Sequence, residues 1–466
     1  MIFRNISIGL TACALAVQHN LVAILLAALA SLALVSNGAA QTFIRDAEIE
    51  ATIRGWAAPL LRAAGIPPSD VRIHLVRNDD LNAFVAGGQR IFIYTGLLQR
   101  SESPEQVIGV LAHEIGHIQG GHLARTRGEL ENASAQSILF TVLGAAAAVA
   151  SGDARVGAAV GAFGQTAALK NLLQYSRVQE SAADQAALSL LDATGQSARG
   201  LEEFLSVLGD QELLLPERQD PYLRTHPISQ DRIRALQDHL QHSPHSTAEP
   251  DPASRKAHAR MKAKLDGFLK PVGRVLSDYP ESDTGTPAMV ARAVAYHRDH
   301  RPDAADRIVS GLLERLPADP YIWELRGQFQ FERGNVPAAL QAYDKAATLA
   351  PDQALIAISY AQALVVDPNP KSLEKAITLL EPAVQREPDD GSAWRTLGIA
   401  YGRLDRLGEA ALALAESEAR FGRADLAFQQ ARRAQSLLKQ GSPAWLRAED
   451  IRLAAERSLE RARAQR

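Results

Sequence analysis

Hydrophobic positions recur at helical spacing over most of the chain and at strand spacing in one short region. Between Arg45 and Ala64, five apolar residues recur every three to four positions and predict a helix: Ile49, Ile53, Trp56, Leu60 and Leu61. Apolar and polar side chains alternate over 71–76, which is typical of a strand. Apolar residues at 84–85 and 91–94 flank Gly87-Gly88, so this segment predicts a β-hairpin.

The next amphipathic segment has a well-marked start. Ser103 is a good N-cap, Pro104 suits the first helical position, and Gln106 occupies the third. Apolar residues then follow at helical spacing until Gly120-Gly121: Val107, Val110, Leu111, Ile115 and Ile118. Two further helices are predicted over 170–192 and 201–208.

The last third of the chain repeats itself. With residue 286 as the first position of a 34-residue unit, blocks begin at 286, 320, 357 and 391, with three residues inserted before 357. Position 4 is large, and holds Met289, Trp323, Tyr360 and Trp394. Position 20 is small, and holds Ala305, Ala339, Ala376 and Ala410. This alternation lets each helix pair nest on the next, as in tetratricopeptide repeats. Residues 425–466 depart from the pattern and carry many charges, as a capping helix pair does.

Composition agrees with a mostly α protein. Aromatic residues make up 5% of the chain and alanine is frequent, which favours helices over β-sandwiches. The predicted fold is an α+β domain with a small sheet over 41–240, a linker and connecting helix over 241–285, and an α-solenoid over 286–466. A net charge of −3 gives no electrostatic reason to expect nucleic acid as a partner.

Residues 1–40 have the features of an export signal peptide. Arg4 is the only charge, an apolar stretch covers Leu21–Val35, and Gly38-Ala39-Ala40 would allow cleavage after Ala40. The alternative is a retained membrane anchor, because Ile6–Val35 is long enough to span a bilayer if it counts as one block. Cys13 is the only cysteine, which excludes an intrachain disulfide.

The segment 138–169 has an unusual composition. It consists almost entirely of Ala, Gly, Val and Leu, and is broken by Asp153 and Arg155. The simpler interpretation is two close-packed helices beside the core. The alternative is peripheral contact with a membrane, because helices rich in small residues also pack in lipid.

A metal-binding motif lies in the middle of the capped helix. In His113-Glu114-Ile115-Gly116-His117 the two histidines stand at i and i+4, so one helix face presents both imidazoles to a single zinc ion. Glu114 stands beside them and can accept a proton from the attacking water. The pattern therefore indicates a metallopeptidase.

Two histidines need a further protein ligand. His122 follows the motif too closely, because five residues turn a helix by about 500° and point its ring off the ligand face. Glu180, within Glu180-Ser181-Ala182-Ala183-Asp184 on a later helix, supplies the ligand instead. Asp184 shares its face and would orient a ligand histidine from behind. The alternative for this pair is an exposed acidic face.

Together these motifs resemble a known family. The zinc motif, Glu180 with Asp184, and Thr225-His226-Pro227 followed by Asp231-Arg232-Ile233 resemble the M48 zinc metallopeptidases. An export signal and a C-terminal tetratricopeptide array narrow the resemblance to the BepA family of the Gram-negative periplasm. The resemblance implies a zincin-like peptidase domain and cleavage of misfolded or stalled outer-membrane proteins. It also implies help with their assembly, through contact of the repeats with the assembly machinery.

The resemblance also assigns residues. It implies one Zn²⁺ held by His113, His117 and Glu180. Glu114 becomes the general base. His226 matches a family histidine near the metal, which would hydrogen-bond the oxyanion or occupy the open metal position at rest. Asn82-Ala83-Phe84 matches the family's edge strand, where an extended substrate could add as a strand with little sequence preference. The alternative there is an ordinary hairpin strand.

The sequence is also compatible with a function of another class. The chain could be a client-binding chaperone or adaptor with a latent or structural zinc site. Glu114 argues against this interpretation, because a purely structural site does not need a base beside the metal.

Overall fold

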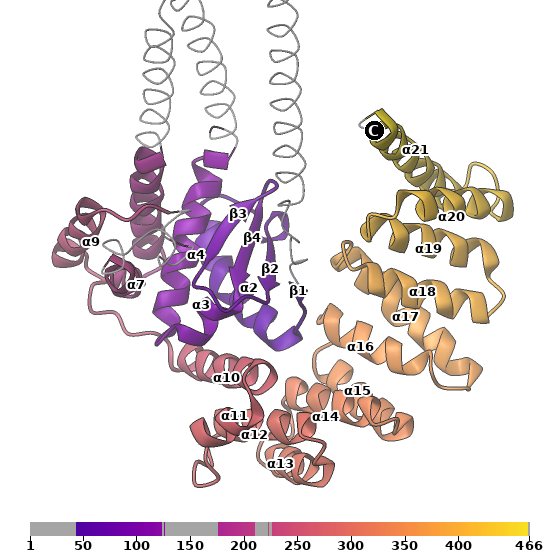
Figure 1. Ribbon diagram of the computed structural model, residues 1–466, viewed down its shortest axis with the longest axis horizontal. Helices are drawn as coiled ribbons and strands as arrows, with labels where there is room; N and C mark the ends of the chain where they lie inside the picture. The colour runs from indigo at the N-terminus through magenta and orange to yellow at the C-terminus, as the bar shows by residue number, and fades with distance from the viewer. Residues whose placement is uncertain (1–42, 124, 126–175, 210–221, 223–225, 465–466) are drawn as a thin grey trace, which may run out of the picture.

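The computed structural model has two parts, an α/β body that contains the sheet and a curved array of helix pairs (Figure 1). The structure describes residues 43–123, 125, 176–209, 222 and 226–464. The predicted export signal over 1–40 and the small-residue segment over 138–169 lie outside these residues. Within the described part of the chain, no helix combines the length and apolarity that a membrane crossing requires.

A four-stranded sheet forms the centre of the α/β body. Its strands are β1 (Phe43–Ile44), β2 (Arg72–Val76), β3 (Ala83–Ala86) and β4 (Arg90–Tyr94), in the order β1-β2-β4-β3. β2 and β4 are parallel, whereas the two outer pairs are antiparallel. Gly87 and Gly88 join β3 to β4 with φ values of 60° and 100°, a left-handed conformation that other residues rarely adopt. The strand and the hairpin predicted from the sequence are confirmed.

Three helices contact the sheet: α2 (Ala47–Ala63), α3 (Thr95–Arg100) and α4 (Pro104–Gln119). α7 (Arg199–Gly209) packs on α4, α9 (Gln230–His242) packs on α7, and a further helix spans 176–193. Ser103 caps α4 as predicted, since its side chain accepts from the N–H of Gln106. Apolar side chains of β2 and β4 pack with those of α2 and α4 in one core, and Ile53, Leu60 and Ile91 are fully buried. This core fixes the position of α4 against the sheet, and with it the positions of His113 and His117.

Two helices join the body to the array, α10 (Pro252–Leu269) and α11 (Val272–Asp278). Met261 and Leu265 of α10 belong to the core of the α/β body. Ala263 of the same helix packs with Val275 and Ala291 on the side of the array. The connecting helix α10 therefore packs against both parts of the structure.

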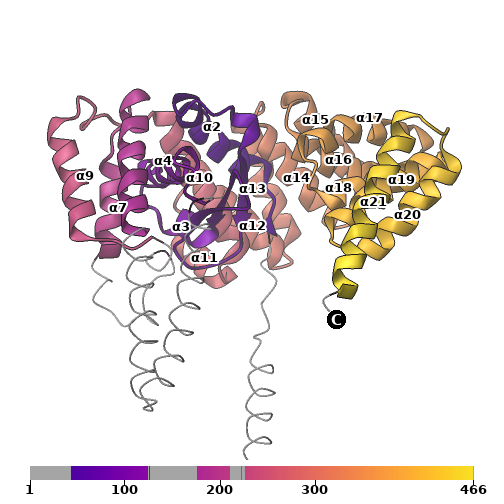
Figure 2. The same ribbon diagram turned by 90° about the horizontal axis from the view of Figure 1, so that it is seen from above.

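The array consists of five helix pairs, which Figure 2 shows following one another away from the α/β body. Their bounds are α12 (Thr286–Arg298), α13 (Pro302–Arg315), α14 (Pro320–Glu332), α15 (Val336–Leu349), α16 (Ala354–Leu364), α17 (Pro370–Arg386), α18 (Gly391–Arg403), α19 (Leu407–Arg420), α20 (Ala424–Leu437) and α21 (Pro443–Ala464). A Cβ at Gly327 would come within 2.8 Å of the Tyr343 ring, which explains the small residue at this position of the repeat. The α-solenoid predicted from the sequence is confirmed.

One detail of the predicted repeat register is wrong. The third pair begins at Ala354, and the connections before α14 and α16 both have four residues, 316–319 and 350–353. The three extra residues therefore do not precede residue 357. They fall in the first turn of α17, which has 17 residues where α13 and α15 each have 14. Ala361 therefore takes the position that Gly327 and Gly398 occupy in their own repeats.

The start of α2 is tied to the array. Ala47 lies in the same buried cluster as Tyr343 and Tyr360. Ion pairs across the junction are Arg45–Glu387 (2.7 Å), Arg54–Glu387 (3.0 Å) and Arg72–Asp389. These contacts hold the β1 side of the sheet against the α17–α18 turn.

This junction is expected to lose stability as the pH rises. Burial, with the carboxylates of Asp46 and Glu48 nearby, raises the pKa of Glu324 to about 8 despite Lys264. Between pH 4.5 and 8 the folded state therefore holds a proton that the unfolded state releases, so the free energy of unfolding falls over this window. Because each unit of pKa shift is worth about 1.4 kcal/mol, we expect Glu324→Gln to be at least about 1 kcal/mol more stable than the parent at pH 8 and equal to it near pH 4.5, by urea unfolding.

Glu332 provides the control on the same helix. A hydrogen bond from His297 lowers the pKa of its carboxyl, so Glu332→Gln should not gain stability as the pH rises. A stability difference for Glu324→Gln that does not change between pH 5 and pH 8 would contradict the prediction.

Candidate metal centre

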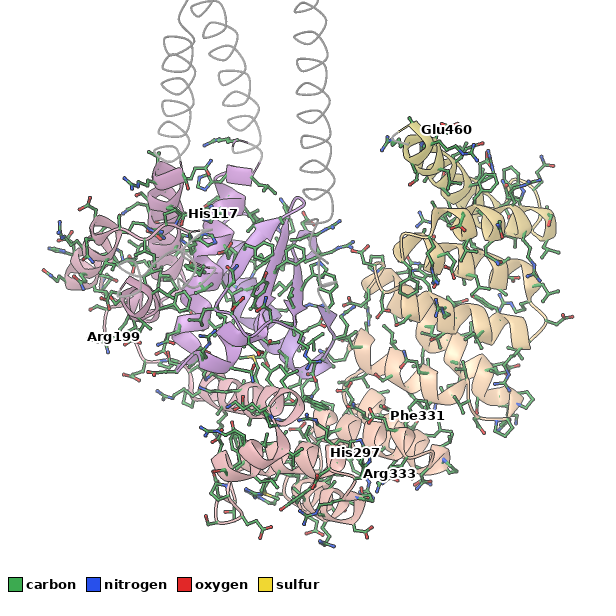
Figure 3. All side chains as sticks on the ribbon, viewed as in Figure 1. His117, Arg199, His297, Phe331, Arg333 and Glu460 are labelled. Carbon is green, nitrogen blue, oxygen red and sulfur yellow. The ribbon has the colours of Figure 1, made fainter. Side chains whose placement is uncertain are left out.

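The helix α4 supplies two metal-binding side chains to one point. His113 is fully buried, and its Nε2 lies 3.1 Å from Nε2 of His117, one turn further along. Figure 3 labels His117 in the α/β body. Two ring nitrogens this close favour one shared cation, because their lone pairs converge. The i, i+4 spacing of the motif therefore brings both imidazole rings to one point, as predicted from the sequence.

A glycine between the histidines allows a second helix to approach. A Cβ at Gly116 would lie 2.7 Å from the carbonyl oxygen of Ala183, which no real side chain tolerates. The helix over 176–193 therefore packs directly on α4. Its Glu180 places Oε2 3.3 Å from Nε2 of His113 and Oε1 3.3 Å from Nε2 of His117.

A third histidine completes the group. Nδ1 of His226 lies 3.2 Å from Oε2 of Glu180, and its Nε2 lies 3.2 Å from the carbonyl oxygen of Ala83 on β3. The ring of Tyr222 stacks on His226 at 4.5 Å between centroids. One ligand atom from each of His113, His117, Glu180 and His226 lies within 4.8 Å of the others.

Outer side chains fix the orientation of these groups. Nδ1 of His113 donates to Oδ1 of Asp184 at 2.9 Å. Arg232 donates to both oxygens of Asp184, at 2.6 and 2.9 Å, and its third nitrogen lies 3.0 Å from Glu180. On the other side, Nδ1 of His122 lies 2.9 Å from Nδ1 of His117.

These contacts set the charges of the site. Burial lowers the pKa of His113, but hydrogen bonds to Asp184 and Glu180 outweigh it and raise the pKa to about 10. Burial raises the pKa of Glu180, yet the charge of His226 and hydrogen bonds from the histidines bring it well below its usual range. The pKa of Asp184 is lowered too, because hydrogen bonds from His113 and Arg232 outweigh burial. The site thus keeps two carboxylates ionised and attracts a cation.

Glu114 is the unsatisfied group of the centre. It is fully buried, and within the described residues neither of its oxygens has a hydrogen-bond partner. Nε2 of His226 is 3.5 Å from Oε1. A buried carboxylate without a hydrogen bond, beside imidazole and carboxylate metal ligands, fits a divalent metal with a polar molecule next to it, because both would offset the cost of burying the charge.

The structure brings most of the predicted site residues together, but not all of them. His113, His117, Glu180, Asp184, Glu114 and His226 are all brought together. Ala83 reaches the centre through its backbone, whereas the side chain of Phe84 stacks on Phe92 on the sheet's other face. The carbonyl of Asn82 accepts from the N–H of Tyr94.

Three supporting residues were missed by the sequence analysis: His122, Tyr222 and Arg232. Arg232 stands in a quoted motif, and its position near the start of a helix just after His226 is the one available hint. His122 was expected to point off the ligand face, yet its ring turns back to 2.9 Å from His117. Gly120 makes room for this ring, since a Cβ at Gly120 would lie 2.3 Å from it.

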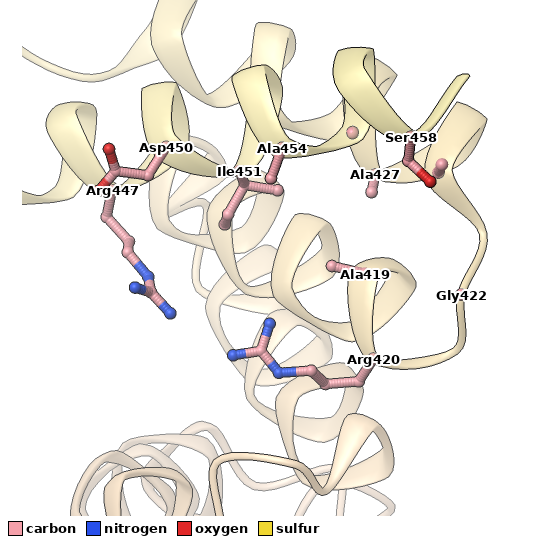
Figure 4. Close-up of a pocket in the computed structure, with 11 residues that line it drawn as sticks. Ala419, Arg420, Gly422, Ala427, Arg447, Asp450, Ile451, Ala454 and Ser458 are labelled. Atoms are coloured by element: carbon pink, nitrogen blue, oxygen red, sulfur yellow. The ribbon is translucent and has the colours of Figure 1, made fainter. Parts of the chain in front are cut away.

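A pocket lies far from this centre, between α19, α20 and α21 (Figure 4). Its volume is about 410 Å³. Arg420 and Arg447, which line it, both pair with the buried Glu416. None of the metal-binding residues borders it, so it is separate from the candidate site.

Known proteins match both parts of the chain. Residues 43–240 match the model of peptidase family M48, and residues 286–438 match the tetratricopeptide domain of cytochrome c-type biogenesis protein H. The putative beta-barrel assembly-enhancing protease of Vibrio cholerae is 24% identical over 87% of this chain and 84% of its own. The beta-barrel assembly-enhancing protease of Escherichia coli is 23% identical over 86% of this chain and 81% of its own.

A shorter relative matches a smaller part of the chain. Metalloprotease YcaL of Escherichia coli is 27% identical over 39% of this chain and 68% of its own. The resemblance to M48 peptidases is thereby confirmed. The chain carries an M48 peptidase domain followed by a tetratricopeptide domain, and it is a metallopeptidase.

Proposed function

We propose that this chain is a zinc endopeptidase of the cell envelope that degrades misfolded or stalled outer-membrane proteins and aids their assembly. The observation that carries the proposal is the buried carboxylate of Glu114 beside the ligand atoms of His113, His117 and Glu180. Asp184 is proposed to hold His113 in place. A site that only stabilises the fold does not need the base, which argues against a chaperone or adaptor with a latent metal site.

The residues have distinct parts in hydrolysis. The three ligands would hold Zn²⁺, which supplies a Lewis acid that polarises the scissile carbonyl. Glu114 accepts a proton from the attacking water and passes it to the leaving amine. His226 can hydrogen-bond the oxyanion through Nδ1, which faces the metal-binding side chains at 3.2 Å from Oε2 of Glu180 and 3.4 Å from Nε2 of His113. An extended substrate would lie along Asn82-Ala83-Phe84.

The relatives' names support the proposed substrate class, and the predicted export signal supports the proposed location. We assign 41–240 to the peptidase domain, 241–285 to the connection and 286–466 to the repeats, which offer a concave surface to clients or to the outer-membrane assembly machinery. We place the protein in the periplasm, with the signal cleaved after Ala40. N-terminal sequencing of the mature protein distinguishes this from a retained anchor.

Metal removal is the direct test. We expect a chelator to lower hydrolysis of a reduced, unfolded protein at least about 100-fold, and Zn²⁺ but not Mg²⁺ to restore it, because imidazole ligands suit zinc. Cleavage is followed on gels, and metal content by mass spectrometry. An inhibitor of serine proteases should have no effect.

The outcomes separate the two functions. Undiminished cleavage by metal-free protein would contradict the proposal. Absence of cleavage by the zinc-loaded protein, together with suppression of client aggregation, would favour the chaperone.

A further inference from the structure

Aromatic rings form a stack across the outer face of the sheet, opposite the helices. Phe84 of β3 stacks on Phe92 of β4 at 5.1 Å and 14° between planes. Phe92 stacks in turn on His74 of β2 at 5.0 Å and 21°. The ring of Tyr94 meets Phe84 edge-on at 5.9 Å. Phe84 is therefore held by two neighbours and is still only half-buried.

The stack is uncharged near neutral pH. Burial, with the charges of Arg45, Arg90 and Arg72, lowers the pKa of His74 to about 4. Its ring thus behaves as another aromatic face. Phe43 of β1 ends the stack on the far side, 5.8 Å from His74 and 52% exposed.

The backbone beside Phe84 is arranged for a further strand. The N–H of Tyr94 donates to the carbonyl of Asn82 at 2.9 Å, which makes these two residues a hydrogen-bonded pair. Because such pairs alternate along an antiparallel ladder, Phe84 bonds to β4, while Ala83 and Val85 turn their N–H and C=O groups to the other edge. That edge carries no strand in the described part of the chain. The carbonyl of Ala83 already reaches Nε2 of His226, so the edge begins at the metal centre.

These facts predict which substrate side chain meets Phe84. In a strand added antiparallel to β3, the residue opposite Phe84 forms a non-hydrogen-bonded pair, with Cα atoms about 4.5 Å apart and side chains on the same face. Aromatic pairs at such positions stabilise the pairing. The ring of Phe84 is already fixed by Phe92 and Tyr94, so little side-chain freedom remains to be lost on binding.

We infer that Phe84 determines specificity, by selecting an aromatic side chain at one position of an extended substrate bound along β3. The inference rests on the proposed function, since it deepens how that site takes its substrate. This inference differs from the expectation of little sequence preference. Hydrogen bonds from the backbone of β3 do not depend on the substrate's side chains, whereas contact with the ring of Phe84 does. The occupant is an unfolded polypeptide segment with an aromatic residue.

Binding to an inactive variant tests the inference apart from proteolysis. The full chain with Glu114→Gln, loaded with zinc, is titrated with two fluorescein-labelled nine-residue peptides of Thr and Ser that differ only in a central Phe or Ala. We expect the Phe peptide to bind about fivefold tighter. Adding Phe84→Ala should reduce this ratio below about twofold. Phe84→Leu, which keeps an apolar side chain, should give a ratio between the two.

Phe43→Ala is the matched control. It makes the same substitution on the same face, three strands from the β3 edge, and should keep the fivefold ratio. Zinc content and thermal unfolding of each variant show that the fold is retained. Equal binding of the two peptides by the Glu114→Gln chain would overturn the inference. So would a preference that survives Phe84→Ala or is lost in Phe43→Ala. None of these results depends on cleavage, so a failure of the proposed protease would be seen separately.

Discussion

Replacing Glu114 with Gln is expected to lower kcat/KM for an unfolded protein substrate by a factor of roughly 10²–10⁴ while the metal stays bound. Glutamine matches glutamate in shape but cannot accept the proton of the attacking water. Both oxygens of Glu114 are buried without a hydrogen-bond partner in the described part of the chain, so the substitution breaks no hydrogen bond and removes only the 3.5 Å contact with His226. Hydrolysis rate and zinc content of the same preparation measure the two effects.

Glu105→Gln supplies the control on the same helix. Glu105 stands in the first turn of α4, two turns before the metal ligands, and its substitution should leave kcat/KM unchanged. Equal activity of the Glu114→Gln protein and the parent would refute the assignment of Glu114 as base. Loss of zinc together with activity would instead give the side chain a part in holding the metal.

Replacing Arg232 with Met is expected to have the second-largest effect. The guanidinium donates to both oxygens of Asp184, which holds His113, and also contacts Glu180. Without the guanidinium, the buried carboxylates of Asp184 and Glu180 lose the positive charge that pairs with them. This loss should lower the unfolding free energy of the metal-free protein by about 3–5 kcal/mol. Zinc affinity should fall by roughly 10–100-fold, because the ligand His113 loses its fixed orientation. Urea unfolding and competition with a chromogenic chelator measure these two quantities.

Arg234→Met is a close match on the same helix, α9. Arg234 pairs with Asp231 at the surface, and its side chain is 73% exposed. Its loss should change the unfolding free energy by less than about 0.5 kcal/mol and leave zinc affinity unchanged. An Arg232→Met protein with the parent's zinc affinity would show that Asp184 holds His113 unaided.

Local patterns predicted most of the fold and the inner part of the site. The cap at Ser103, the apolar positions of α4 and the i, i+4 histidines depend only on residues within a few turns of one another, so the sequence contains all that is needed. The repeat pattern is also local, because each helix pair packs chiefly on the next. Glu180 could be found from the need for a further ligand and from its i+4 partner Asp184.

Local sequence patterns could not predict the features that depend on tertiary contacts. Arg232 acts on Asp184 across 48 residues, and no periodicity links the two. The ring of His122 turns back because Gly120 leaves it space, which helical geometry alone does not reveal. The misplaced insertion in the third repeat has a related cause, since aromatic Tyr360 resembles the large residues of the other blocks more closely than Ala357 does.

The ion pair between Arg45 and Glu387 joins residues 342 apart in the sequence, and this separation bears on the order of events during synthesis. A chain that emerges N-terminus first exposes the start of α2 long before the α17–α18 turn exists. Contacts of such high sequence separation close late in folding. The junction with the array can therefore form only after nearly the whole polypeptide has appeared, and a truncated chain leaves the first helix of its peptidase domain without its distant partners.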